Sequence, residues 1–209
     1  MDNSCVIYLV CRGTTQNDKV PQLHQPILGR RIDPALDDDG KQQRRALEAC
    51  FASRRVTKVF TSPANRALLI AMEISRVMGG VDLHIASELA PVDCGEWSGE
   101  CWCDVQSSAD YEAFVKDPGT HGYPGGENLC QVQKRVVTFI REQAAAFPTD
   151  SMAMVTHPDV IRTAVAAFGN IPLSRIKDID QDFGQITLLR CMDGEISIGA
   201  HAQQCSSVL

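Results

Sequence analysis

The pattern of apolar and polar positions alternates along the chain between short strand-like runs and longer segments with helical spacing. Residues 6–10 form a short apolar run that is typical of a buried strand, and a loop at 12–15 ends it. Later runs rich in β-branched residues have a similar length and also end in polar residues. We predict these runs as strands at 56–62, 81–87 and 151–157.

Helical spacing of apolar residues marks the other regular segments. The first of them begins after Asp37, whose side chain suits an N-cap. The second has Pro63 in its expected first turn and Gly79-Gly80 at its end. The four predicted helices span 36–54, 63–80, 127–147 and 158–168.

The order of these elements predicts the fold class. After the last helix, the segments 184–194 and 195–201 follow as a hairpin or as two adjacent edge strands. Strands that alternate with helices are typical of a parallel sheet with helices on both faces. We therefore predict one α/β domain over 1–209, a three-layer α/β/α sandwich. Its sheet should be mostly parallel, with the first, second and fourth strands near the centre.

Three polar side chains follow the carboxyl ends of these strands. Arg12 comes after the first strand, Arg66 falls in the first turn of the helix after the second, and His157 ends the fourth. Ligands of open α/β sheets lie at this edge, and a helix N-terminus favours an anion there. Each residue alone is more often a solvated arginine or a packed histidine. Together they predict a phosphate or carboxylate site.

The charge balance restricts the partners of the protein. A formal net charge of −6 argues against nucleic acid or an acidic membrane surface as the main partner, because binding to either requires a surface rich in basic residues. No apolar stretch approaches the roughly 20 residues that cross a bilayer, and no signal-peptide pattern opens the chain. We expect a cytoplasmic protein that binds a small anionic molecule, either a phosphate ester or a carboxylate. A homodimer is left open as its assembly.

The cysteines indicate neither disulfides nor a metal centre. Nine cysteines are an odd number, and a chain of this length can form a stable core without disulfide bonds. We therefore expect free thiols. Cys94, Cys101 and Cys103 form the one tight group, but they lack a C-x-x-C pair and a histidine nearby in the sequence. We predict no metal and no cofactor.

Six segments carry further motifs in a fixed order: YLVCRGTT, LGRRIDPALDDDGKQQ, VFTSPANRALLIA, LAPVDCGEWSGE, YPGGENLCQVQKRV and AMVTHPDVIRTAV. This series resembles the histidine phosphatase superfamily, whose best-known members are the cofactor-dependent phosphoglycerate mutases. The resemblance extends almost from end to end. It implies the phosphoglycerate mutase-like fold and a phosphatase-type site.

The resemblance also implies roles for single positions. In the family a histidine after the first strand attacks phosphorus, two arginines and a second histidine hold the phosphoryl oxygens, and a glutamate protonates the leaving oxygen. In this chain the nucleophile's position falls on Arg12, the preceding arginine's on Cys11 and the acid's on Pro91. The second arginine and the second histidine match Arg66 and His157.

These departures weaken the implied chemistry. The guanidinium of Arg12 stays protonated and offers no lone pair to phosphorus, and Pro91 has no proton to give. Asp93 is one substitute acid, although an exposed loop aspartate is its more common role. Cys11 as a thiolate and His157 are substitute nucleophiles, but a small buried thiol is the more common outcome for Cys11.

A binding site is what the retained residues predict best. The expected ligand-binding residues are Cys11, Arg12, Gly13, Thr14, Arg66 and His157. Arg30 or Arg31 could add to them, and Trp97 with the loop to Trp102 could form a wall, although simple packing is favoured for Trp102. Three classes remain open: a non-catalytic binder, an enzyme with other chemistry that uses His157 as acid or base, and a divergent phosphomonoesterase. Any catalysis would rest on His157, Arg66 and Arg12.

Overall fold

The computed structural model describes residues 4–205, which are organised around one six-stranded sheet. The strands are β1 (Ser4–Cys11), β2 (Lys58–Thr61), β3 (Leu83–Ile85), β4 (Ser151–Thr156), β5 (Ile186–Met192) and β6 (Glu195–Gln203). Their order across the sheet is β3-β2-β4-β1-β5-β6. The first, second and fourth strands therefore lie near the centre, as predicted.

Parallel pairing dominates the sheet. The pairs β1–β4, β2–β4 and β2–β3 are parallel, whereas β5 is antiparallel to both β1 and β6. The register aligns Val10 with Val155 and Cys11 with Thr156, so β1 and β4 end side by side. The predicted hairpin is confirmed as β5 and β6. The carboxyl ends of three central strands consequently meet at one edge.

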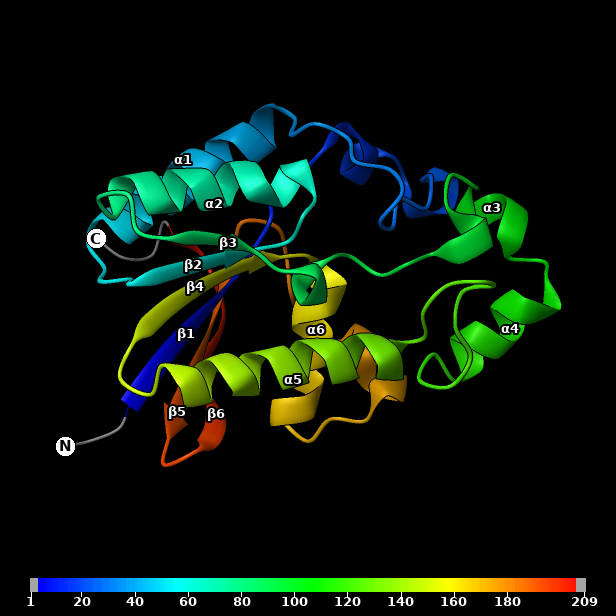
Figure 1. Ribbon diagram of the computed structural model, residues 1–209. Coiled ribbons are helices and arrows are strands. Elements are labelled where there is room, and N and C mark those ends of the chain that lie inside the picture. The colour runs from blue at the N-terminus through cyan, green and yellow to red at the C-terminus, as the bar shows by residue number, and fades with distance from the viewer. Residues whose placement is uncertain (1–3, 206–209) are drawn as a thin grey trace.

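Helices cover both faces of the sheet. Helices α1 (Asp38–Ala52) and α2 (Asn65–Val77) lie on one face, and α5 (Leu129–Ala146) and α6 (Pro158–Phe168) lie on the other (Figure 1). This arrangement confirms the three-layer α/β/α sandwich. Among the described residues, no helix combines the length and the apolar character that crossing a bilayer requires.

The start of α2 differs from the prediction. Pro63 lies before the helix, which begins at Asn65. The Asp33 carboxylate caps it from a distant loop, because Oδ2 accepts a hydrogen bond from the Asn65 N–H at 2.5 Å and Oδ1 accepts one from the Arg66 N–H at 3.4 Å. By contrast, Asp37 caps α1 as predicted, and its Oδ1 accepts the Gly40 N–H at 2.7 Å.

The sheet separates two apolar clusters. Alternate side chains of β1 point to opposite faces, as a period of two requires. Ile7 and Leu9 pack with α5 and α6, whereas Val10 packs with α1 and α2. All three side chains are fully buried. The central strand is therefore fixed from both sides, and its last residue has a defined position.

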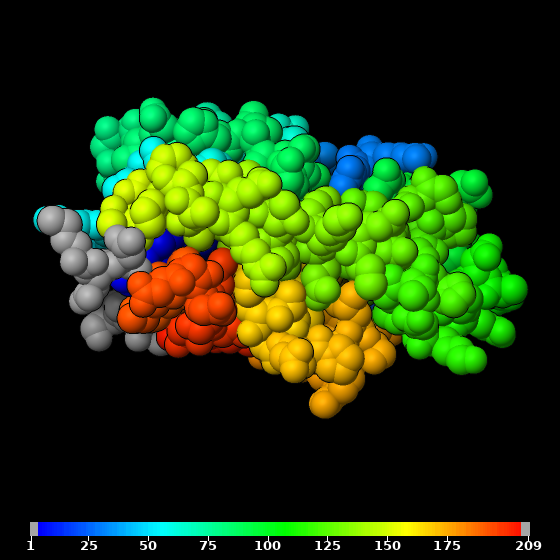
Figure 2. All heavy atoms as spheres, turned by 60° about the horizontal axis from the view of Figure 1, so that its bottom comes forward, coloured from blue at the N-terminus to red at the C-terminus, as the bar shows by residue number. Residues whose placement is uncertain are grey.

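A cap of short elements extends beyond the carboxyl ends of the strands (Figures 1 and 2). It contains η1 (Gln16–Lys19), η2 (Gln22–His24), η3 (Ser87–Leu89), η4 (Gly95–Trp97), α3 (Trp102–Val105) and α4 (Ala109–Lys116), while η5 (Leu173–Asp178) follows α6. The sequence did not predict α3 and α4, because they are too short to show a periodic apolar face. An aromatic cluster around Trp97 stabilises this cap, and its other members are Trp102, Tyr111, Phe114 and Tyr123.

Candidate functional site

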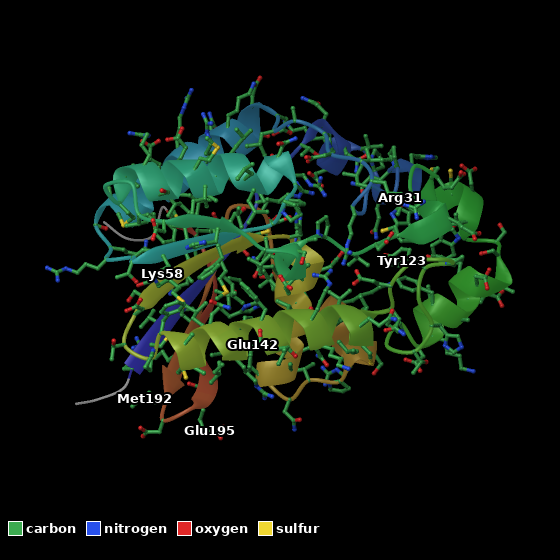
Figure 3. All side chains as sticks on the ribbon, viewed as in Figure 1. Arg31, Lys58, Tyr123, Glu142, Met192 and Glu195 are labelled. Atoms are coloured by element: carbon green, nitrogen blue, oxygen red, sulfur yellow. The ribbon has the colours of Figure 1, made fainter. Side chains whose placement is uncertain are left out.

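A cavity of about 330 Å³ lies between the sheet edge and the cap. Arg12, Arg66 and His157 all contribute to its wall, so the structure brings the three strand-end residues together. Tyr123 of the cap also lines it. Figure 3 shows Tyr123 at the cap end of the molecule and Lys58 at the opposite end of the sheet.

Arg12 is held directly at the end of β1. Its N–H donates to the Thr156 carbonyl at 2.9 Å, which joins it to the end of β4. Its guanidinium donates to both carboxylate oxygens of Asp18, at 2.8 and 3.0 Å, and lies over the Phe183 ring at 4.6 Å. The side chain is buried. The charge of Arg12 is therefore already matched by a neighbouring acid on the same wall.

Asp18 owes its place to the turn after β1. Its Oδ2 also accepts the N–H and the hydroxyl of Thr15, both at 2.8 Å, so it closes a short turn as well as the ion pair. Burial raises the pKa of Asp18, but the hydrogen bonds and charge of Arg12, with the bonds from Thr15, lower it further, so the net shift is downward. The pair is ionised at neutral pH.

Arg66 anchors the long loop that precedes α1. Its Nη1 donates to Asp33 Oδ1 at 2.8 Å and to the Ile32 carbonyl at 3.1 Å, and its Nη2 donates to the Gly29 carbonyl at 3.2 Å. Burial and repulsion from the charge of Arg12 lower the pKa of Arg66. Arg12 and Arg66 both line the cavity, and each is paired with a carboxylate.

His157 immediately precedes α6. A hydrogen bond of 2.8 Å joins its Nε2 to the hydroxyl of Ser62, which follows β2. Burial, followed by repulsion from Arg66 and Arg12, lowers the pKa of His157 well below its usual 6.5. The imidazole is therefore neutral at neutral pH. Ser62 is fully buried and is not among the residues that line the cavity, so this contact fixes the ring and does not form a serine nucleophile pair.

Two donors at this site lack partners within residues 4–205. The Nε atoms of Arg12 and Arg66 are buried and form no hydrogen bond there. Burying such a charged donor without an acceptor carries a substantial cost. An anion between the two guanidiniums would reduce that cost through its field and its oxygens.

The other predicted ligand-binding residues lie outside the cavity wall. Cys11 is fully buried in the core beneath α5 and α6, and burial raises its pKa to about 12. Gly13 packs tightly against Gly40, where an added Cβ would lie 2.7 Å from the carbonyl oxygen. The Thr14 hydroxyl donates to Asp37 at 2.7 Å. Cys11 is thus a packed thiol, whereas Gly13 and Thr14 support the turn.

Neither Pro91, at the position of the family's acid, nor Asp93, its possible substitute, places an acidic group on the cavity wall. Pro91 lines the cavity, and its carbonyl accepts hydrogen bonds from Arg30 at 2.9 Å and from Arg135 at 3.2 Å. Asp93 is not on the wall, and its Oδ1 accepts the Gly95 N–H at 3.0 Å. Arg30 and Arg31 pair with Glu127 and Asp93 and do not reach the wall either.

Several residues of the wall were missed by the sequence interpretation. Arg162 of α6 donates to the carbonyls of Ile179 and Gln181, at 3.1 and 2.8 Å, and to the carboxylate of Asp159. Asp159, Asp182 and Asp18 line the cavity together with the three arginines. The wall therefore carries as many carboxylates as guanidiniums. One signal was present in the sequence, since Thr15 and Asp18 have the spacing of a capping box.

The roles expected for the two tryptophans are reversed. Trp102 lines the cavity, although packing was favoured for it, whereas Trp97 packs inside the aromatic cluster and is not on the wall. Both rings are amphipathic and close in sequence. Which of them faces the cavity depends on the path of α3.

We expect Cys11 to resist thiol alkylation in the folded protein at neutral pH, because it has no exposed surface and a raised pKa. Cys130 is exposed and serves as the internal control. Mass spectrometry after brief treatment with iodoacetamide measures both sites. Labelling of Cys11 at the rate of Cys130 would make it an accessible thiol and contradict its assignment to the core.

We expect the free energy of unfolding to fall as the pH decreases from about 6.5 towards 5. The pKa of His157 is lowered in the folded state, so the unfolded chain binds its proton first and the stability is fully present only above the usual value of 6.5. One such proton contributes at most about 1.4 kcal/mol per pH unit. Urea unfolding at several pH values measures the slope. His157→Gln should reduce it and His121→Gln, at an exposed site, should not; equal slopes would contradict the assignment.

Comparison with known proteins agrees with this arrangement. The family model of the histidine phosphatase superfamily (branch 1) matches residues 7–204. The chain therefore belongs to the histidine phosphatase superfamily. Its fold is shared with the phosphoglycerate mutase-like phosphatases of that superfamily.

Individual relatives are more distant. Phosphoserine phosphatase 1 of Hydrogenobacter thermophilus is 27% identical over 148 residues, which are 69% of each chain. YhfR of Bacillus stearothermophilus superposes with a TM-score of 0.85 at 21% identity, covering 95% of this chain and 97% of the other. A phosphoserine phosphatase mutant of Entamoeba histolytica in complex with phosphoserine gives a TM-score of 0.83 at 16% identity, covering 98% and 100%. These two structures are similar to the chain in fold.

Proposed function

We propose that the cavity binds the phosphoryl group of a small phosphorylated molecule, and that ordinary phosphohistidine catalysis has been lost. The observation that carries this proposal is Arg12. It occupies the end of β1, where the resemblance to the superfamily assigns the nucleophilic histidine, and it is buried in an ion pair with Asp18. A protonated guanidinium cannot attack phosphorus.

Binding is supported by the electrostatics of the wall. Arg12 and Arg66 both lack an acceptor for Nε, and burial followed by their charges lowers the pKa of His157, which keeps the imidazole neutral. The oxygens of a phosphate dianion could accept hydrogen bonds from these two Nε atoms. The names of the relatives agree with this ligand class, because phosphoserine is a small phosphomonoester.

The loss of phosphohistidine catalysis is supported by the surroundings of Cys11, Pro91 and Asp93. The Cys11 thiol is fully buried and protonated at neutral pH. Asp93 is outside the wall, and the carbonyl of Pro91 is occupied by two arginines. Neither Cys11 nor Asp93 is therefore placed to act as the nucleophile or the acid that the family chemistry requires.

An enzyme with other chemistry is the second candidate function. Its support is the lowered pKa of His157, because a neutral imidazole on a cavity wall can accept a proton at neutral pH. A lyase, isomerase or transferase would use such a base. The same assays separate this candidate from a binder, since an enzyme would consume the ligand.

We expect calorimetry to detect binding of inorganic phosphate or 3-phosphoglycerate at millimolar concentrations or below, and we expect little or no hydrolysis of an aryl phosphate. Succinate tests the carboxylate class. Arg12→Ala should not abolish any residual hydrolysis, because Arg12 is not the nucleophile. If none of these anions binds, the cavity is not a site for small anions.

A phosphoenzyme would contradict the second half of the proposal. Incubation with a phosphate donor, acid-sensitive labelling and peptide mapping would reveal a phosphohistidine. If the label maps to His157, the protein is a phosphatase that has moved its nucleophile. Unlabelled protein that still binds phosphate agrees with the proposal.

A further inference from the structure

Three side chains with metal-binding chemistry meet beside the cavity. The ligand atoms of His24, Cys101 and Cys103 all lie within 4.8 Å of one another. His24 is exposed, and the two cysteines are half-buried. The prediction of no metal relied on the lack of a C-x-x-C pair and of a histidine near the cysteines in the sequence. Folding supplies a histidine from η2, which is distant in sequence but contacts α3.

The main chain holds the two halves of this group together. His24 ends η2, and Cys101 directly precedes α3. Next to them, the Trp102 N–H donates to the Gln25 carbonyl at 3.3 Å, and Pro26 forms a β-bridge with Cys101. These contacts do not involve the three side chains. The ligand atoms are therefore brought close by the fold itself, which reduces the entropy that binding an ion would cost.

The two sulfur atoms are positioned by the start of α3. Cys101 Sγ donates to the Leu23 carbonyl at 3.1 Å, next to His24, and accepts the Cys103 N–H at 3.4 Å. Cys103 Sγ lies 3.6 Å from Asp104 Oδ1. Both thiols thus lie close to the imidazole of His24, and the carboxylate of Asp104 lies beside Cys103.

We propose that His24, Cys101 and Cys103 form a Zn²⁺ site. Two thiolates and one imidazole are a ligand set that suits this ion, with typical distances of about 2.3 Å to sulfur and 2.0 Å to nitrogen. The three ligand atoms already lie within 4.8 Å of one another, so small side-chain rotations would complete the site. Asp104 or a water molecule supplies the fourth ligand. Binding replaces the two S–H protons, which pass to solvent, and no oxidation takes place.

The ion would tie together two parts of the cavity wall. Gln22 and Gln25 flank His24 on η2 and its turn, and Trp102 lies between the two cysteines. All three residues line the cavity. An ion held by His24, Cys101 and Cys103 would therefore stiffen this side of the wall, while Arg12, Arg66 and His157 would remain free for the anion.

The test uses the full chain, reduced with a phosphine and stripped with a chelator. Zn²⁺ is titrated in competition with a chromogenic chelator, and Co²⁺ is added separately because thiolate ligands give it an intense charge-transfer band. We expect one ion per chain. Cys101→Ser, Cys103→Ser and His24→Asn should each weaken Zn²⁺ binding at least about tenfold, since even changes outside the ligand shell reach that size.

Cys130→Ser is the matched control, because Cys130 is an exposed cysteine outside the group. It should bind Zn²⁺ as the original chain does. Binding that survives all three ligand substitutions, or a Co²⁺ spectrum without the thiolate band, would overturn the proposal. So would the absence of binding to reduced protein whose circular dichroism shows it to be folded. Phosphate binding is measured in parallel, so that failure of the metal site and of the anion site are seen separately.

Discussion

Arg66→Ala is expected to weaken the binding of a phosphate ester by about one to two orders of magnitude, because a charge-assisted hydrogen bond contributes roughly 1.5 to 3 kcal/mol. Arg66 lies in the first turn of α2, where the Asp33 carboxylate already accepts the N–H groups of Asn65 and Arg66. The guanidinium itself is therefore the group that would meet the anion. Its Nε has no partner among the described residues. Calorimetry with 3-phosphoglycerate measures the change.

Two controls separate charge from structure in this experiment. Arg76→Ala removes an exposed arginine of the same helix and should leave binding unchanged. Asp33→Ala breaks the contact between Arg66 and its loop but keeps the guanidinium. Equal losses in Asp33→Ala and Arg66→Ala would show that the loop, and not the charge of Arg66, supports binding.

Asp18→Ala is expected to lower the free energy of unfolding by about 3 to 5 kcal/mol, because it leaves a buried charge without its partner. The side chains of Arg12 and Asp18 are only 7% and 11% exposed. Asp18 also accepts two hydrogen bonds from Thr15, and these would be lost as well. Urea denaturation measures the difference.

The double variant Arg12→Leu/Asp18→Leu tests whether the cost of Asp18→Ala comes from the unpaired charge of Arg12. Removing both charges should recover much of the loss, because neither partner is then left unpaired. Asp39→Ala, at an exposed position of α1, is the control and should change stability by less than about 0.5 kcal/mol. A cost below about 1 kcal/mol for Asp18→Ala would mean that the pair behaves as a solvent-screened surface bridge.

The layered fold could be predicted because it depends on patterns that repeat along the chain. The apolar run of β1 and the amphipathic face of α5 each recur over enough residues to identify their period. The sequence is less informative where a side chain from a distant segment determines at which residue a helix begins. The start of α2 is an example, since Asp33 caps it from another loop and Pro63 is left outside.

The candidate site was predictable to the same extent. The edge-of-sheet rule correctly brought Arg12, Arg66 and His157 to one cavity, because strand order and strand ends follow from the fold. Which acid would neutralise Arg12 depended on side-chain directions in a turn. Likewise, the path of the cap determined that Trp102, and not Trp97, faces the cavity.

The central position of β1 has a consequence for the order in which the protein folds. Its two neighbours, β4 and β5, are both formed by residues after 150, so β1 is synthesised well before either of its partners. Such distant pairings slow folding. Until then Ile7, Leu9 and Val10 form an apolar strand with two open edges, which is a site for aggregation. Chains that end before β5 should therefore be insoluble, however well their helices form.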